Sequence, residues 1–335
     1  MSLDRTRLAQ LASRSTFYKG RFRNLERTPS HGLTDFFRWQ IETGGRFPPG
    51  KRFPLLKPDA HLLAEPATVP RLTWLGHASF LFQFKNCNVL TDPVFSERCS
   101  PVQFVGPKRY TPAPLQVAEL PEISHVLISH NHYDHLDEKT VRDLYRRFGD
   151  AVQFFVPTGV ADWFIKRGIS NVVELGWWQA SVDAGQCAEL FCLPTQHFSG
   201  RTATDRNATL WCSWLMDIDG FRLYFAGDTG YAPLFRDIGS LFAPVDLALL
   251  PIGAYDPRWF MGPVHIAPEE ALRIHQDIGA RCSVAMHWGT FVLTSEPMDE
   301  PPRRLRQAMA EMGLADDLFR VLQHGETVQF AELMK

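Results

Sequence analysis

The sequence predicts a four-layer αββα sandwich, in which two β-sheets pack face to face and helices cover their outer faces. Two observations lead to this prediction. From Arg71 onward, short apolar runs bounded by turn residues predict strands, and helical stretches lie between some of them. The chain has 335 residues, of which 45% are apolar and 21% charged, and this composition suffices for a large core.

Predicted strands outnumber predicted helices in this part of the chain. The strand runs are rich in β-branched, aromatic and other apolar residues, and several end in Gly, Pro or Asp. In chain order they are RLTWLGHASFLFQF, NVLTDP, HVLISHNH, QFFVPT, VVEL, ELFCLPTQH, LWCSWLMDI, FRLYFAGDTG, LALLPIG and CSVAMHWG. The predicted helices between them are Glu138–Arg147, Val160–Arg167, Ala232–Ile238, Pro268–Ile278 and Pro302–Met312.

Residues 1–68 are predicted to form a basic arm, and residues 69–335 the sandwich domain. One helix is predicted in the arm, over Leu33–Glu42, where apolar residues recur three to four apart. The first 60 residues carry 12 Lys and Arg against 5 Asp and Glu, a net charge of +7, whereas the whole chain carries −2. The sequence leaves two interpretations open: the arm lies on an anionic membrane surface, or it is a solvated segment wrapped on the domain.

The nearly neutral charge of the whole chain argues against a nucleic-acid binder. The first twenty residues lack the apolar stretch of a signal peptide, and no run of 18 apolar residues could span a bilayer. We therefore expect a cytoplasmic protein, either free or peripheral on the inner face of the membrane. The six cysteines form no CxxC pair, so we expect no disulfide framework and several buried thiols.

The strongest functional signal is the run S-H-N-H-Y-D-H at residues 129–135, directly after a predicted strand. It places His130, His132, Asp134 and His135 within six positions. Burying so many imidazoles unpaired is costly, because each ring needs partners for two nitrogens. Imidazole and carboxylate together are typical ligands of zinc, although iron or manganese tolerates much of the same set. Four such groups would crowd one tetrahedral ion that keeps an open position, so we expect two ions.

Three more candidate ligands follow predicted strands: His197 after ELFCLPTQ, Asp228 after RLYFAG, and His287 after CSVAM. Loops that leave the carboxyl ends of neighbouring strands meet at one edge of a sheet, so we expect these residues at one site. The predicted ligands are His130, His132 and His197 for one ion, Asp134, His135 and His287 for the other, and Asp228 as a bridge. Two ions so placed activate a water molecule for hydrolysis, which makes Asp134 a catalytic candidate as well as a ligand.

The other histidines have weaker signals. His77, in WLGHASF, and Asp92, in LTDP, either orient a ligand or a water, or are ordinary hydrogen-bonded loop residues. His265, in YDPRWFMGPVH, either donates a proton to a leaving group or to phosphate, or is another such loop residue. We expect His31, His61, His125 and His324 in loops or at the surface, and His275 in a structural role on a helix.

The motif HxHxDH, followed by His, Asp and His in that chain order, resembles the ligand pattern of the metallo-β-lactamase superfamily. Within it the chain is similar to the family of phospholipases D that hydrolyse N-acylphosphatidylethanolamine, over roughly Arg71 to Glu326. The similar segments are TWLGHASFL, LTDPVFS, GPKRY, LPEISHVLISHNHYDHLD, FVPTGVADW, NVVELGWW, TQHFSGRT, FAGDTGY, PIGAYDPRWFM, PEEALRIH and HWGTF.

The resemblance implies the αββα fold, two zinc ions per chain and cleavage of a membrane glycerophospholipid on the head-group side of its phosphodiester. The products would be phosphatidic acid and an N-acylethanolamine, with His265 as proton donor to the leaving group. It also implies a membrane-associated homodimer with an apolar groove for acyl chains. Trp163, Phe164, Trp259, Phe260 and Met261 are candidates for that groove, although each also suits a core. The pattern departs at Val264, where the family has a polar amide.

Three other interpretations compete with this one. A zinc hydrolase of the same fold can act on a lactone or on another phosphodiester, because fold does not fix substrate. An iron oxidoreductase is disfavoured because the chain has no Gly-rich dinucleotide motif after a strand. A regulatory protein with an inactive site is disfavoured because all seven ligand positions hold competent residues.

Overall fold

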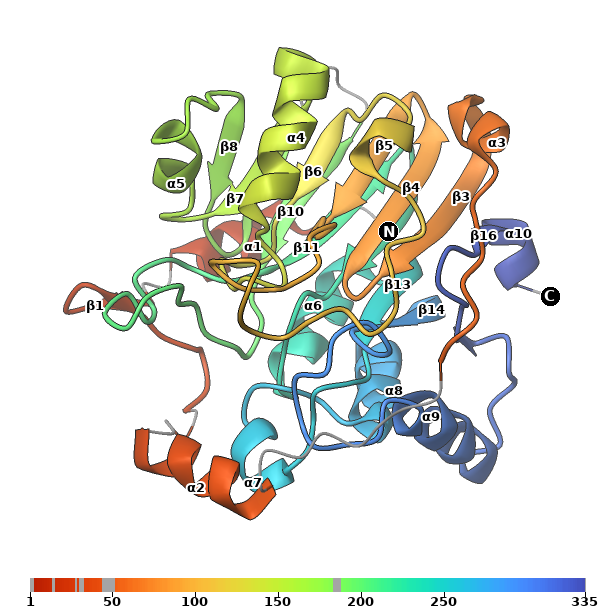
Figure 1. Cartoon of the computed structure of the whole chain (residues 1–335). Coiled ribbons are helices and arrows are strands. Elements are labelled where there is room, and N and C mark those ends of the chain that lie inside the picture. The colour runs from red at the N-terminus through yellow and green to blue at the C-terminus, as the bar shows by residue number, and fades with distance from the viewer. Residues whose placement is uncertain are drawn as a thin grey trace.

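The computed structural model of the chain describes residues 3–13, 16–27, 29, 33–43, 52–182 and 188–334. Two seven-stranded sheets lie face to face, and helices flank their outer sides (Figure 1). This arrangement confirms the predicted αββα sandwich.

The first sheet has an antiparallel half and a parallel half. Its strand order is β16 (Thr327–Gln329), β3 (Ala67–Gly76), β4 (Ser79–Lys85), β5 (Cys87–Thr91), β6 (His125–Leu127), β7 (Gln153–Pro157) and β8 (Val172–Leu175). Pairing is antiparallel from β16 to β5 and parallel from β5 to β8. The carboxyl ends of β5 and β6 therefore lie side by side at one edge.

The second sheet is built in the same way. Its strand order is β9 (Gln179–Val182), β10 (Glu189–Leu193), β11 (Ser213–Ile218), β12 (Phe221–Phe225), β13 (Val245–Pro251), β14 (Ala280–Met286) and β15 (Phe319–Arg320). Pairing is antiparallel from β9 to β12 and parallel from β12 to β15. The predicted apolar runs all contain strands of these two sheets, whereas the short β9, β15 and β16 lack enough periodic residues to predict.

Helices cover the outer face of each sheet. On the first sheet, α4 (Glu138–Phe148) and α5 (Ala161–Ile165) bury Val141, Leu144 and Phe164 in one cluster with residues of β4, β6 and β7. On the second, α8 (Pro268–Asp277) contacts β13, β14, α6 (Leu234–Phe242) and α9 (Glu300–Glu311). Each helix matches a predicted one, although α6 begins two residues later than predicted and continues through Phe242. The short α3 (Ala60–Ala64), α7 (Arg258–Met261) and α10 (Phe330–Leu333) were not predicted.

The core lies between the sheets and under the helices. In β7, Phe154 packs under α4 and α5, and the next residue, Phe155, packs between the sheets. Successive side chains of a strand point to opposite faces, so a strand buried on both faces is a continuous apolar run. This explains why QFFVPT shows no alternation.

The N-terminal arm packs on the domain through several contacts. α1 (Arg5–Ala12) buries Leu8 and Leu11 in the core cluster of the second sheet. A hairpin of β1 (Phe17–Tyr18) and β2 (Arg21–Phe22) follows, and then α2 (Leu33–Thr43), whose Trp39 stacks on Phe260 with ring centres 5.5 Å apart. Membrane contact by the arm stays a prediction.

Several expectations from the sequence are wrong in detail. His125 lies in β6 and is buried, with its ring stacked on Phe155 of β7. His324 lies outside the named strands, as expected for a loop residue, but it is buried against Trp74. Ile41, one of the recurring apolar residues on which the helix over Leu33–Glu42 was predicted, is 80% exposed. Cys99, Cys192, Cys212 and Cys282 are buried thiols, as expected for several cysteines, but Cys87 is disulfide-bonded. His31 lies outside the described residues.

No helix in the described ranges combines the length and the apolar character that crossing a bilayer requires.

Candidate metal centre

The candidate ligands lie in loops that follow strand ends of both sheets. The segment with His130, His132, Asp134 and His135 follows β6 of the first sheet. From the second sheet, His197 follows β10, Asp228 follows β12 and His287 follows β14. The sandwich brings these ends together, so neither sheet alone builds the site.

One group consists of the imidazoles of His130, His132 and His197. The Nε2 atom of His130 lies 2.8 Å from Nδ1 of His132, and Nε2 of His197 lies 3.4 Å from the same Nδ1. The three rings thus present nitrogen atoms to a common point. This is the set that the sequence assigned to one ion.

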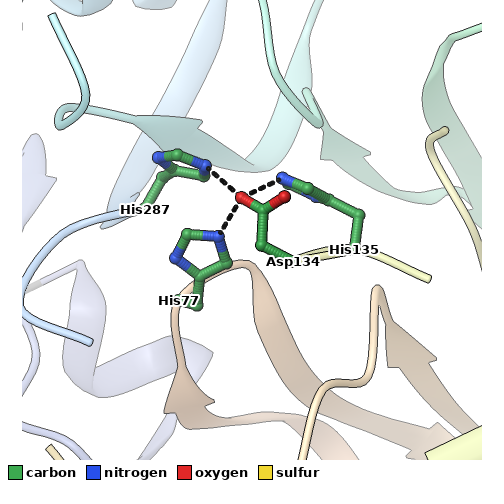
Figure 2. A group of neighbouring side chains, drawn as sticks. All are labelled: His77, Asp134, His135 and His287. Atoms are coloured by element: carbon green, nitrogen blue, oxygen red, sulfur yellow. Dashed lines mark hydrogen bonds and ion pairs between the residues drawn. The ribbon is translucent and has the colours of Figure 1, made fainter. Parts of the chain in front are cut away.

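A second group surrounds the carboxylate of Asp134. Figure 2 shows His77, His135 and His287 pointing at this carboxylate from three sides. Its Oδ2 atom lies 3.0 Å from Nε2 of His77, 3.4 Å from Nε2 of His135 and 3.6 Å from Nε2 of His287. The group contains the three predicted ligands of the other ion and adds His77 to them.

Asp228 lies between the two groups. Its Oδ2 atom is 3.2 Å from Nε2 of His135 and 3.8 Å from Nε2 of His197, and its Oδ1 atom is 3.2 Å from Nε2 of His287. One carboxylate therefore faces ligands of both groups, which is the position that a bridging ligand requires.

The outer contacts hold individual ligands in orientation. Asp92 lies 2.6 Å from Nδ1 of His135 and accepts hydrogen bonds from the backbone N–H and the hydroxyl of Ser129. Nδ1 of His197 lies 2.9 Å from the carbonyl oxygen of Val264. Because the Nδ1 atoms are occupied, the Nε2 atoms of both rings remain for the centre. The sequence grouped His77 with Asp92, but the two residues contact different ligands: Asp92 orients His135, and His77 contacts Asp134.

Glycine permits the close approach of the two sheets beside the ligands. Gly227 precedes Asp228 at the end of β12 and has a φ of +58°, a conformation that residues with a Cβ rarely adopt. A Cβ atom at this position would lie 2.6 Å from the Cβ of Ser129, which precedes His130. Any larger residue would push the two ligand segments apart.

The buried polar atoms fit a divalent cation. Nε2 of His135, Nε2 of His287 and Oδ1 of Asp228 are buried and in ion-pair contact within the site, but they form no hydrogen bond with any residue that the structure describes. Such orphaned atoms are costly unless a ligand satisfies them. Burial lowers the pKa values of His135 and His287, but the Asp228 and Asp134 carboxylates overcome it and raise both, that of His287 to about 9. The site therefore favours positive charge at the point where these atoms meet.

His265 borders the same site from the loop before α8. Its Nδ1 atom lies 3.9 Å from Oδ2 of Asp228 and has no hydrogen-bond partner, and its side chain is 14% exposed. Burial lowers its pKa to about 4, against the opposing effect of Asp228. The ring is therefore neutral near pH 7 and offers one N–H donor to a bound molecule.

The groove candidates lie in different places. Phe164 is fully buried under α5, so it belongs to the core. Trp259 and Phe260 on α7 are covered in part by α2, because the Arg38 guanidinium lies 4.6 Å from the Trp259 ring centre and Trp39 stacks on Phe260. The carbonyl oxygen of Met261 accepts the backbone N–H of His265, so this helix supports the loop of His265.

Sequence reasoning missed two contacts of the site. Asn24, in the arm, donates to the carbonyl oxygen of His197 at 2.9 Å and accepts from its backbone N–H at 3.1 Å. Asn131, between two ligands of the motif, accepts the backbone N–H of Gly200 at 2.7 Å. The position of Asn131 inside the motif was a usable signal, whereas nothing near Asn24 in the sequence points to the site.

The comparisons with known proteins agree with this geometry. A family model described as a β-lactamase superfamily domain matches residues 87–288. The chain belongs to the metallo-β-lactamase superfamily. Igni18, a metallo hydrolase from the hyperthermophilic archaeon Ignicoccus hospitalis, has the same fold, with a TM-score of 0.59 and 23% identity over 78% of this chain and 98% of that one.

Two relatives within the superfamily are named as phospholipases. The N-acyl-phosphatidylethanolamine-hydrolyzing phospholipase D 1 of Caenorhabditis elegans is 40% identical over 264 residues, which are 76% of this chain and 74% of that one. The corresponding mitochondrial protein of Saccharomyces cerevisiae is 39% identical over 77% of this chain, although the match spans only 55% of its own length. The resemblance inferred from the motifs is confirmed, and the chain is a metal-dependent hydrolase of this superfamily.

Proposed function

We propose that this protein is a binuclear zinc phosphodiesterase that cleaves glycerophospholipids on the head-group side, with N-acylphosphatidylethanolamine as the first substrate to test. One observation carries the proposal: two groups of buried ligand atoms face a single carboxylate, Asp228, between them. The similarity to the worm phospholipase supports the substrate class.

The proposed ligands follow from the two groups. His130, His132 and His197 hold one ion, and Asp134, His135 and His287 hold the other, with Asp228 shared. Divalent cations bound here supply Lewis-acid polarisation of phosphodiester oxygens and activation of water. Asp92 and the carbonyl oxygen of Val264 keep the rings of His135 and His197 in one orientation, so the ligand set is arranged before substrate binds.

His265 is the proposed partner of the leaving oxygen. Its ring is close to Asp228, is partly open to solvent and carries a nitrogen without a partner. As a neutral ring it stabilises the departing alkoxide by donating a hydrogen bond. His265→Ala should therefore lower the rate of hydrolysis of N-acylphosphatidylethanolamine much more than that of an activated nitrophenyl phosphodiester, whose leaving group needs no hydrogen bond. Equal losses on both substrates would assign His265 to binding instead.

A membrane-facing surface is proposed beside the loop Cys99–Lys108. Phe104 is 82% exposed and Val105 57% exposed, and the neighbouring groove is lined by Lys139, Arg142 and Arg146, which form ion pairs with Asp143 and Glu138 in the same groove. Exposed apolar side chains flanked by cations are typical of peripheral membrane contact. Phe104→Asp should lower binding to anionic vesicles about tenfold, from the loss of one buried aromatic side chain.

The control for the membrane surface is Ile165→Asp, because Ile165 is 60% exposed on α5. Equal loss of vesicle binding in both variants would contradict the placement of the surface. The homodimer and the cytoplasmic location stay predictions.

The direct test of the proposed function is turnover of N-acylphosphatidylethanolamine in detergent micelles, with metal content measured on the same sample. Release of N-acylethanolamine and phosphatidic acid by protein that holds two zinc ions per chain is the expected result. Two ions without this release would remove the substrate assignment and leave lactones and other phosphodiesters as the alternatives.

A further inference from the structure

A second pocket adjoins the metal centre on the side of the N-terminal arm. Its volume is about 530 Å³, and it lies between arm residues 23–27 with Pro29 and the segment that follows His197. His197, Phe198 and Val264 line it from the metal centre, and Arg23, Arg27 and Arg206 line it from the arm and from the domain. The arm thus contributes half of a cavity that borders a candidate ligand.

The three arginines of this pocket have no carboxylate partner among the residues that the structure describes. The Arg206 guanidinium lies 4.1 Å from the ring centre of Phe198, and that of Arg23 lies 4.1 Å from the ring centre of Tyr18. Elsewhere in the arm the pattern differs, because Arg5 pairs with Glu189 and Arg7 with Asp237. Aromatic faces thus hold Arg23 and Arg206 in place without neutralising them.

Phe198 connects this pocket to the metal centre. Its ring centre lies 4.6 Å from that of His132 and 4.8 Å from that of His197. The Arg206 cation on the same ring is therefore one aromatic side chain away from two candidate ligands.

Uncompensated cations beside a pair of divalent ions are unfavourable. Like charges repel. Arg23, Arg27 and Arg206 are exposed at the surface and accessible to an anion, and partial desolvation lowers the pKa of the Arg206 guanidinium. Among the described residues that line the pocket, Glu26 carries the one carboxylate, against three arginines. An anion bound in the pocket would offset this cost.

We propose that the pocket formed by Arg23, Arg27 and Arg206 binds an anionic group on the substrate's head group, beyond the phosphodiester that is cleaved. The inference rests on the proposed function, because it places the scissile phosphodiester at the metal centre. Within the glycerophospholipids it predicts a preference for those whose head group ends in a carboxylate or a phosphate. A lipid with an uncharged N-acyl group is then accepted but not preferred.

The test uses two matched lipids, N-glutaryl- and N-pentanoyl-phosphatidylethanolamine, which have acyl groups of the same length with and without a terminal carboxylate. Each is presented at the same low mole fraction in neutral detergent micelles, and both kcat/KM and equilibrium binding are measured. Wild-type protein should favour the glutaryl lipid about tenfold, the effect of one charge-assisted hydrogen bond. Arg206→Gln and Arg27→Gln should each bring the ratio toward one. Arg306→Gln, an equal charge change at an exposed position of α9, should keep it.

The possible outcomes separate the pocket from the function. Turnover of both lipids without preference in wild-type protein would overturn the pocket and leave the proposed function. Absence of turnover, with carboxylate-dependent binding that Arg206→Gln abolishes, would overturn the function and keep the pocket. Absence of both would overturn both.

Two further experiments identify the source of the anion. If phosphatidylglycerol added to N-pentanoyl micelles restores the full rate, the pocket binds a neighbouring lipid and the proposal is wrong. If free glutarate or inorganic phosphate produces this effect, the pocket is a site for a soluble anion and the proposal is equally wrong.

Discussion

Asn24 is expected to hold a metal ligand in place from outside the sandwich domain. Its side-chain amide donates to the carbonyl oxygen of His197 at 2.9 Å, and its Oδ1 atom accepts from the backbone N–H of His197 at 3.1 Å and from Nε1 of Trp211 at 3.0 Å. Asn24→Ala removes all three hydrogen bonds. The Trp211 indole keeps a second acceptor, the carbonyl oxygen of Thr195, whereas the buried backbone of His197 loses its partners.

The magnitude follows from these contacts. Each ordinary hydrogen bond contributes about 1 kcal/mol net, and a buried donor left unsatisfied costs about 1–3 kcal/mol. We therefore expect Asn24→Ala to lower the free energy of unfolding by about 2–3 kcal/mol. Because His197 becomes less well oriented, zinc affinity should fall roughly tenfold, the lower end for loss of an outer contact to a ligand.

Urea unfolding of the zinc-loaded protein and competition with a chelator measure the two effects. Asn24→Asp is the control, since it keeps the acceptor for His197 and Trp211, loses the donor and places a carboxylate oxygen against the carbonyl oxygen of His197. An intermediate loss is expected for it. If Asn24→Ala unfolds within 0.5 kcal/mol of wild type and retains zinc equally well, the arm does not position the ligand.

Three further predictions concern the centre and the fold. Asp228→Asn should lower kcat at least about a hundredfold while the far-UV spectrum is unchanged, since it removes the shared negative charge; near-normal turnover would contradict a bridging carboxylate. Chelation of the metal should lower the free energy of unfolding by about 4 kcal/mol when free zinc had been a thousand times its dissociation constant, and zinc should restore it; a melting temperature indifferent to zinc would argue against a resident ion. Burial lowers the pKa of His324 to about 3, so the unfolded chain binds this proton from about pH 6.5 downward while the folded chain does not. The contribution of His324 to the free energy of unfolding is present above pH 6.5 and is lost as pH falls toward 3, by about 1.4 kcal/mol per pH unit. His324→Gln should therefore flatten the plot of urea midpoint against pH between 6.5 and 3; parallel plots for wild type and variant would show that His324 does not titrate this way.

The local part of the site was predictable from the sequence. His130, His132, Asp134 and His135 lie within one turn after a strand, so their spacing alone places them together. The sandwich was equally predictable, because strand runs such as QFFVPT differ clearly from the helical periodicity of Glu138–Arg147.

The rest depends on contacts between distant segments. The hydrogen bond of His197 goes to a backbone carbonyl at Val264, and a backbone atom leaves no trace in the residue type. Asn24 is 173 residues from His197 and lies in an arm without a motif. The burial of His324 was not predictable for a related reason. A single histidine carries no periodicity, and its burial depends on how Trp74 packs against it.

The division of the ligands between two sheets has an energetic consequence. The first sheet supplies the ligands of the HxHxDH motif, and the second supplies His197, Asp228 and His287. Ions held by both sets would tie the sheets together at their strand ends, so the free energy of metal binding would add to that of sheet packing. The large core between the sheets, which includes Phe155 and Trp214, holds the sandwich independently of the ions. The fold can thus form first and arrange the ligands, and metal then stabilises an edge that carries uncompensated carboxylates.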